Sequence, residues 1–139
     1  MAAKSAIPMR DEAMGRIRSV HPYAWLWEIL EADASFVLGP MFGTKVVYLD
    51  GKLMLCFAAK EEPWRGILVC TNREDQASLV AQFPLLSPHP ILGKWLYLPE
   101  TADAFETVAE RLVRLAKERD PRIGVAPQNK KRKRAEPFT

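Results

Sequence analysis

Residues 41–52 read Met-Phe-Gly-Thr-Lys-Val-Val-Tyr-Leu-Asp-Gly-Lys, and this stretch decides the fold. Asp50-Gly51 is a two-residue turn signal, because glycine tolerates positive φ and aspartate can bond its own backbone. Residues 45–49 before the turn are rich in β-branched and aromatic residues, and residues 52–58 after it form an apolar run. The stretch therefore predicts a β-hairpin.

Three more segments have the composition of strands. Residues 35–38 predict a short strand before the hairpin, because Gly39-Pro40 breaks the chain after it. The apolar runs at residues 66–70 and 93–98 predict a fourth and a fifth strand. Short turns join the first strands, so the sheet is expected to be antiparallel.

Helical spacing of apolar residues predicts three helices, over about residues 22–33, 73–83 and 103–119. Residues 85–90 contain two prolines and predict a rigid, exposed loop. The expected order is α-β-β-β-β-α-β-α. The expected class is α+β, a two-layer domain with an antiparallel β-sheet and the helices mainly on one face.

The composition predicts one compact domain with tails. The 139 residues are 48% hydrophobic and 27% charged, which is sufficient for a core without disulfides or metals. We expect a mobile N-terminal lead-in at residues 1–20, a domain at 21–125 and a disordered basic tail at 126–139. No apolar stretch has the length of a membrane span and residues 1–8 lack a signal-peptide core, so a cytoplasmic location is expected.

The positive charge is concentrated in the tail. The formal net charge is +3, but five consecutive cations against Glu136 leave residues 1–129 with a sum of −1. The run can attract phosphates by counterion release, which predicts weak, salt-sensitive nucleic-acid contact. The other interpretation is a solvated tail, since like charges repel. The residues of the run are Lys130, Lys131, Arg132, Lys133 and Arg134.

Three motifs resemble the N-terminal domain family of the competence regulator TfoX, whose fold is similar to the YjbR proteins. They are Met41-Phe42-Gly43, Tyr48-Leu49-Asp50-Gly51-Lys52 and Tyr97-Leu98-Pro99-Glu100, within a matching order over residues 22–118. The resemblance implies a small α/β domain with a regulatory role and no catalytic residues to carry over. The sequence departs from the family pattern at Val69-Cys70-Thr71 and in the extension at residues 120–125.

No motif predicts catalysis, a cofactor or a metal. The sequence has no Gly-rich phosphate loop, nucleophile elbow or HExxH helix. Cys56 and Cys70 lie on successive predicted strands, where they could form a redox pair, but small buried hydrophobic residues are the favoured interpretation. His21 and His89 could act as acids or bases only beside an orienting carboxylate. We therefore predict a protein that is not an enzyme.

The tryptophans are better pointers to a surface. Trp27 lies about 200° around the helix from Trp25, so Trp27 is expected to be exposed if Trp25 faces the core. Trp64, in a charged loop, is either a lid over the core or a ligand platform. Trp64, His89 and Trp95 could line a cleft.

Two functions remain open. The first is a non-catalytic interaction or regulatory domain with a protein partner and possible weak nucleic-acid contact through the tail; the second is a small-molecule-binding or enzymatic domain that uses the cleft. A homodimer is also expected, because the strands are apolar on both faces and helices cover only one. Either a partner subunit or the segment 123–125 would cover the second face, and Met54 is expected to point outward.

Overall fold

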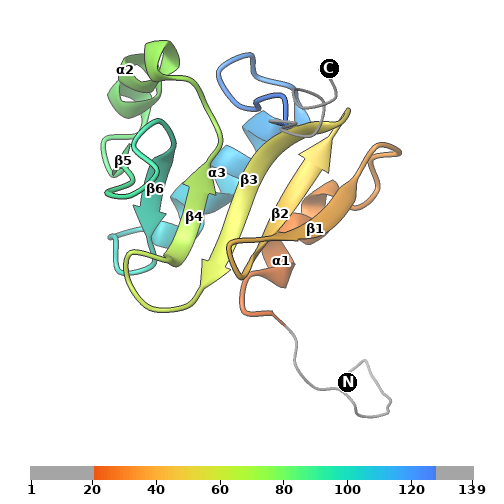
Figure 1. Ribbon diagram of the computed structural model, residues 1–139, viewed down its shortest axis with the longest axis horizontal. Helices are drawn as coiled ribbons and strands as arrows, with labels where there is room; N and C mark the ends of the chain where they lie inside the picture. The colour runs from red at the N-terminus through yellow and green to blue at the C-terminus, as the bar shows by residue number, and fades with distance from the viewer. Residues whose placement is uncertain (1–20, 128–139) are drawn as a thin grey trace, which may run out of the picture.

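The computed structural model describes residues 21–127. Six antiparallel strands form one sheet in the order β1-β2-β3-β4-β6-β5 (Figure 1). The strands are β1 (Val37–Met41), β2 (Thr44–Leu49), β3 (Lys52–Ala59), β4 (Arg65–Val69), β5 (Ser87–Pro88) and β6 (Leu96–Pro99). The helices are α1 (Ala24–Trp27) with the 3-10 turn η1 (Glu28–Leu30), α2 (Arg73–Gln82) and α3 (Phe105–Lys117). The expected α+β class and antiparallel sheet are confirmed.

The hairpin at Asp50-Gly51 joins β2 and β3. Both turn residues have positive φ, +54° at Asp50 and +78° at Gly51, as a type I′ turn requires. Leu49 pairs with Lys52 across the turn, and a bulge follows at residues 47–48. The prediction from residues 41–52 is confirmed.

Helices α1 and α3 cover one face of the sheet (Figure 1). The buried positions of α3 recur at three and four residues and form its apolar stripe, as the sequence predicts. They are Phe105, Ala109, Leu112, Val113 and Ala116. They pack with Leu26, Leu55, Phe57 and Ile67 in the main core.

The first helix differs from the prediction. Only four residues are α-helical before the chain tightens into η1. Trp27 is buried, with its ring centroid 5.3 Å from that of Phe57 in an edge-to-face contact, whereas Trp25 is 43% exposed. The expectation that Trp27 is exposed was wrong, because the core-facing set is Leu26, Trp27 and Leu30 and Trp25 falls outside it.

Two prolines lie in strands where the sequence predicted breaks. Pro40 is inside β1 and Pro88 inside β5. Both strands are at the edges of the sheet, where a missing N–H need not interrupt a ladder. The segment 85–90 is also less exposed than expected, because Leu86 and His89 are buried.

The extension after α3 is held by two arginines. Arg119 donates from Nε to Asp50 at 2.6 Å and from Nη2 to Asp33 at 2.8 Å. Arg122 pairs with Asp120 at 2.8 Å and donates to the side chains of two residues of α2, Ser78 at 3.0 Å and Gln82 at 2.7 Å. These contacts join the extension to the β2–β3 turn and to α2.

The extension then reaches the second face of the sheet. Leu53 and Val125 exchange two backbone hydrogen bonds of 2.9 and 3.0 Å, and Gly124 donates to the carbonyl of Cys70 at 2.7 Å. Val125 therefore covers part of this face from within the chain, which is one of the two expected solutions, whereas Ile123 lies in the main core. Met54 belongs to the main core and is 2% exposed, so the prediction that it points outward was wrong. The homodimer stays a prediction.

Candidate binding groove

The face of the sheet opposite α1 and α3 carries an open groove of about 1240 Å³. It lies between the β1–β2 side of the sheet and the segment 91–95 that leads into β6. Its lining combines an apolar floor with a cationic rim that has neutral polar neighbours. A second, smaller hollow of about 440 Å³ lies between the residues before α1 and the start of α3.

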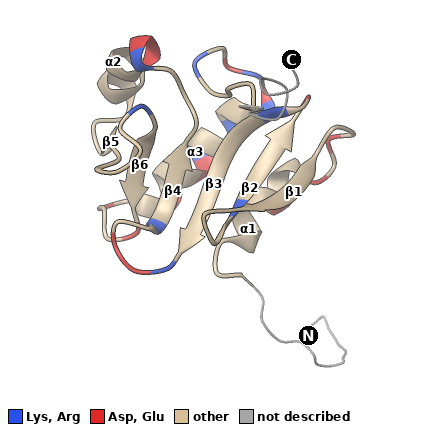
Figure 2. Ribbon diagram, in the orientation of Figure 1, with Lys and Arg blue, Asp and Glu red and all other residues tan. Residues whose placement is uncertain are grey.

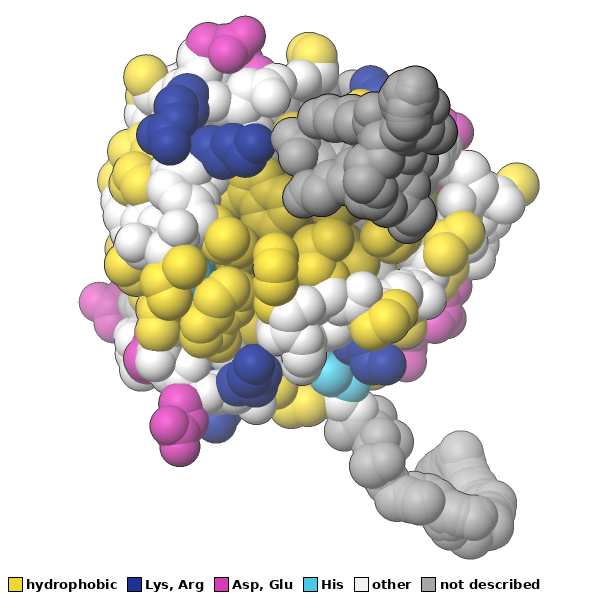
Figure 3. All heavy atoms as spheres, viewed as in Figure 1, with side chains coloured by type: hydrophobic (Ala, Val, Ile, Leu, Met, Phe, Trp, Pro, Cys, Tyr) yellow, Lys and Arg dark blue, Asp and Glu magenta, His cyan; other side chains and the backbone are white. Residues whose placement is uncertain are grey.

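The floor of the groove is apolar. A second hydrophobic cluster, separate from the main core, lies on this face. Its members that also line the groove are Met41, Tyr48, Leu53, Leu92, Trp95 and Val125. Figure 3 shows hydrophobic side chains gathered in the hollow of this face.

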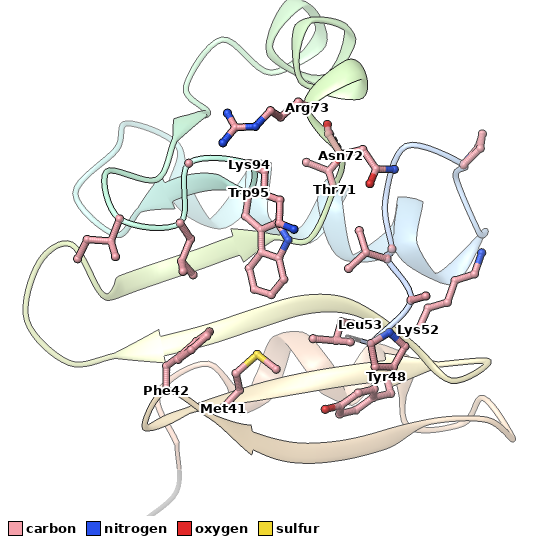
Figure 4. A pocket seen from close by; sticks show the side chains of 18 residues that line it. Met41, Phe42, Tyr48, Lys52, Leu53, Thr71, Asn72, Arg73, Lys94 and Trp95 are labelled. Carbon is pink, nitrogen blue, oxygen red and sulfur yellow. Dashed lines mark hydrogen bonds between the residues drawn. The ribbon is translucent and has the colours of Figure 1, made fainter. Parts of the chain in front are cut away.

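Three cations lie on the rim. Lys52 comes from the start of β3, Arg73 from the start of α2 and Lys94 from the loop before β6 (Figures 2 and 4). All three are exposed, and within residues 21–127 no Asp or Glu lines the groove. The rim therefore favours an anionic ligand, although residues 1–129 sum to a formal charge of −1.

The loop that carries Lys94 and Trp95 is fixed at several points. Gln76 of α2 donates from its side chain to the carbonyl of Gly93 at 2.9 Å. The backbone N–H of Trp95 donates to the carbonyl of Leu92 at 2.8 Å, and the backbone carbonyl of Trp95 accepts from the backbone N–H of His89 at 2.9 Å. The position of the Trp95 ring is thus set by backbone bonds and by α2.

The indole N–H of Trp95 has no hydrogen-bond partner within the described residues. The side chain is 8% exposed, and its ring extends between the two walls of the groove (Figure 4). A buried donor left unpaired costs about 1–3 kcal/mol. An acceptor on a bound ligand would remove this cost.

His89 belongs to a packed aromatic cluster beside the groove. Its ring centroid lies 4.5 Å from Trp64 and 5.3 Å from Tyr97. Nδ1 accepts from the backbone N–H groups of Ile91 and Leu92, both at 3.1 Å, so the neutral ring must donate from Nε2 to the Pro63 carbonyl at 2.8 Å. Both ring nitrogens are committed to the loops, which leaves none for acid–base chemistry.

Of the predicted cleft residues, the structure places one in the groove. Trp95 lines it, whereas Trp64 and His89 stack behind its wall, where Trp64 also contacts Phe42 at 5.8 Å between ring centroids. Trp27 is on the opposite face, in the main core. Trp64 is half-buried and acts as a lid over the second hydrophobic cluster.

The other candidate groups do not line the groove. Cys56 and Cys70 are free and buried, and burial together with the neighbouring Cys56 raises the pKa of the Cys70 thiol. Burial also lowers the pKa of His21, whose ring packs 5.0 Å from Trp27. Within residues 21–127, no group of three or more His, Cys, Asp or Glu residues could hold a metal ion. In the same range, no helix is long and apolar enough to cross a membrane.

The predicted nucleic-acid contact residues, 130–134, lie outside the described residues, as does the lead-in at 1–20. The rim cations Lys52, Arg73 and Lys94 were not identified from the sequence. Each is an ordinary solvent-exposed cation in its local segment, and only the tertiary structure brings the three segments to one groove.

Comparisons with known proteins add no assignment. No family model matches the chain, and neither the curated proteins nor the solved structures gave a match. The resemblance to the TfoX N-terminal domain therefore stays a prediction based on residues 41–52 and 97–100.

Proposed function

We propose that the protein is a non-catalytic interaction domain that binds an anionic partner in the groove. The observation that carries this proposal is the unpaired indole N–H of Trp95, which lies in a groove with an apolar floor and three cations on its rim. Pockets with an apolar lining and a few convergent polar groups are the usual form of a binding site.

The lining argues against catalysis as the main role. In the described residues the groove has no His, Cys, Asp or Glu, the groups that most often transfer protons or form covalent intermediates. Its polar members besides the cations are Tyr48, Thr71 and Asn72. Thr71 already donates from its hydroxyl to the Arg122 carbonyl at 2.6 Å.

The basic run reinforces the same preference. Lys130, the first residue of the run, follows Pro127 of the groove lining by three residues in the sequence. Lys130 to Arg134 are five further cations of the sequence, and a chain with both features suits an anionic partner. A regulatory domain that recruits an acidic partner accounts for both features. A small organic anion in the same groove is the second candidate, favoured only by the same cations.

The proposal is tested by the indole N–H resonance of Trp95 in the full ¹⁵N-labelled chain, assigned with Trp95→Phe. The probes are poly-L-glutamate and a 12-nucleotide oligothymidylate, two polyanions of different chemistry. We expect at least one to shift the Trp95 resonance, and the shift to be lost in Lys94→Glu. If neither probe moves the resonance at low salt, the groove is not an anion-binding surface and the proposal falls.

A further inference from the structure

We infer that the partner of the groove is an acidic peptide segment that carries a large apolar side chain and lies extended between the groove walls. This inference rests on the proposed function and adds the chemical class of the partner. It depends on how apolar and cationic groups are distributed along the groove.

One end of the groove is apolar and exposed. Phe42 is 52% exposed and Ile91 63% exposed, and both line the groove. They lie at the same end, because Phe42 contacts Trp64, Trp64 stacks on His89, and the Ile91 N–H donates to the His89 ring. Large hydrophobic side chains that are exposed at one end of a groove mark a site for an apolar anchor.

The other part of the groove is cationic. Arg73 and Lys94 lie together on one wall, and Lys52 is on the other side (Figure 4). A ligand that satisfies both parts has an apolar group followed or preceded by several carboxylates. Carboxylates at several positions along an extended chain can pair with the cations of both walls.

The middle of the groove suits a peptide backbone. The Trp95 indole extends there and needs an acceptor, which a backbone carbonyl supplies. The groove volume of about 1240 Å³ exceeds the range of about 300–1000 Å³ that is usual for small-ligand pockets. An extended segment of several residues fills such an open space better than one compact molecule.

The lining favours a peptide over a nucleic acid. Sequence-tolerant binding of single strands needs aromatic faces on which bases stack. Trp95 is 8% exposed and presents little of its face, and Phe42 is the one strongly exposed aromatic ring in the described lining. Most of the floor is aliphatic or thioether, from Met41, Leu53 and Val125, which suits apolar side chains instead.

The test uses the full chain and a fluorescein-labelled peptide, Glu-Asp-Glu-Ser-Leu-Phe-Ser-Glu-Asp-Glu, followed by fluorescence anisotropy. This sequence places acids on both sides of the anchor, so it is indifferent to chain direction. Two control peptides replace either the acids by Gln and Asn or Leu-Phe by Ser-Ser. A 12-nucleotide oligothymidylate tests the other class of macromolecule.

Three protein variants report on the groove. Trp95→Phe keeps a ring and removes the donor, which should weaken binding about fivefold, the value of one hydrogen bond. Lys94→Glu exchanges an attraction for a repulsion at an exposed site and should weaken it about tenfold. Lys117→Glu makes the same change on exposed Lys117 of α3, on the covered side of the sheet, and should change binding less than twofold.

We expect the acidic Leu-Phe peptide to bind at least tenfold tighter than either control peptide, with both groove variants weakened. Equal binding of the control peptides, or equal weakening by Lys117→Glu, would overturn the peptide inference. If Trp95→Phe does not fold, Lys94→Glu against Lys117→Glu decides alone. Tighter, Lys94-dependent binding of the oligothymidylate would overturn this inference and leave the proposed function standing; no binding of any probe would remove both.

Discussion

Substitution of Gly66 by alanine should destabilise the protein more than substitution of other glycines. Gly66 is in β4 opposite Pro99 of β6 and has φ of +145°. A Cβ at this position would overlap the Leu98 carbonyl oxygen and lie 3.0 Å from the Glu100 nitrogen. Both contacts are backbone atoms, so β4 and β6 would have to separate by about 1 Å.

The cost follows from two contributions. The strained φ costs about 1–3 kcal/mol for a residue with a side chain. Separation of β4 from β6 also weakens the neighbouring hydrogen bond of 2.9 Å from the Glu100 N–H to the Arg65 carbonyl, and its loss would cost about 1 kcal/mol. We therefore expect a loss of about 3 kcal/mol in the free energy of unfolding and a fall of about 10 °C in Tm.

Urea denaturation followed by circular dichroism measures this change. Gly51→Ala is the matched control, because its φ is +78° but nothing lies within 4 Å of the added Cβ, so only about 1 kcal/mol of strain is expected. Gly39→Ala, with its Cβ in ordinary contact with Tyr48 at 3.5 Å, should change stability by less than about 0.5 kcal/mol. Equal losses for Gly66→Ala and Gly51→Ala would refute the close-approach argument.

Three further predictions concern the loops and the extension. Hydrogen bonds from the backbone and side chain of Ser35, and then from Arg119, lower the pKa of Asp33 to about 2. The stability that this carboxylate contributes is complete above its unfolded pKa of about 4 and is lost as the pH falls to about 2. The Tm should therefore fall between about pH 4 and pH 2, and it should fall less in Asp33→Asn. An equal fall in Tm would contradict this role of Asp33. Arg122→Ala should lower the free energy of unfolding in urea by about 2 kcal/mol, because Asp120, Ser78 and Gln82 all lose a partner. As a control, Arg114→Ala removes only an exposed ion pair with Glu110 and should cost about 0.3 kcal/mol. Equal costs would contradict the idea that Arg122 holds the extension to α2. His89→Phe keeps the ring volume but leaves the Pro63 carbonyl and two backbone N–H groups unpaired. The free energy of unfolding should therefore fall by about 3 kcal/mol in the same assay. A change under about 1 kcal/mol would mean that other groups bond to these three backbone groups.

Local patterns were sufficient for most of the fold. The Asp50-Gly51 turn fixes the β2–β3 register, and the stripe from Phe105 to Ala116 fixes α3, because both signals reside in consecutive residues. The strands at Pro40 and Pro88 were missed for a non-local reason. Whether a proline is tolerated depends on the strand's place at a sheet edge, which local sequence does not contain.

The candidate site was only partly predictable. Trp95 was singled out by its residue type, but its unpaired N–H depends on the packing of the loop against α2 and β3. The rim cations come from three separate segments, and a summed charge of −1 hides their convergence. The prediction for Trp27 was wrong for a related reason. Helix geometry gives the angle between two side chains, but it does not say which of the two faces the core.

The pairing of Val125 with Leu53 has a consequence for how the protein is made. All the strands and helices of the described fold are complete by Lys117, yet Leu53 near the start of β3, which pairs with β2 on one side, exchanges its other backbone hydrogen bonds with Val125. A nascent chain halted at Lys117 also lacks Arg119 and Arg122, and so lacks the contacts to Asp33, Asp50 and α2. Contacts between residues far apart in the sequence can form only after the later residue has been synthesised. Synthesis on the ribosome therefore has to pass residue 125 before the sheet is locked, and the nascent domain stays open to chaperones and proteases until then.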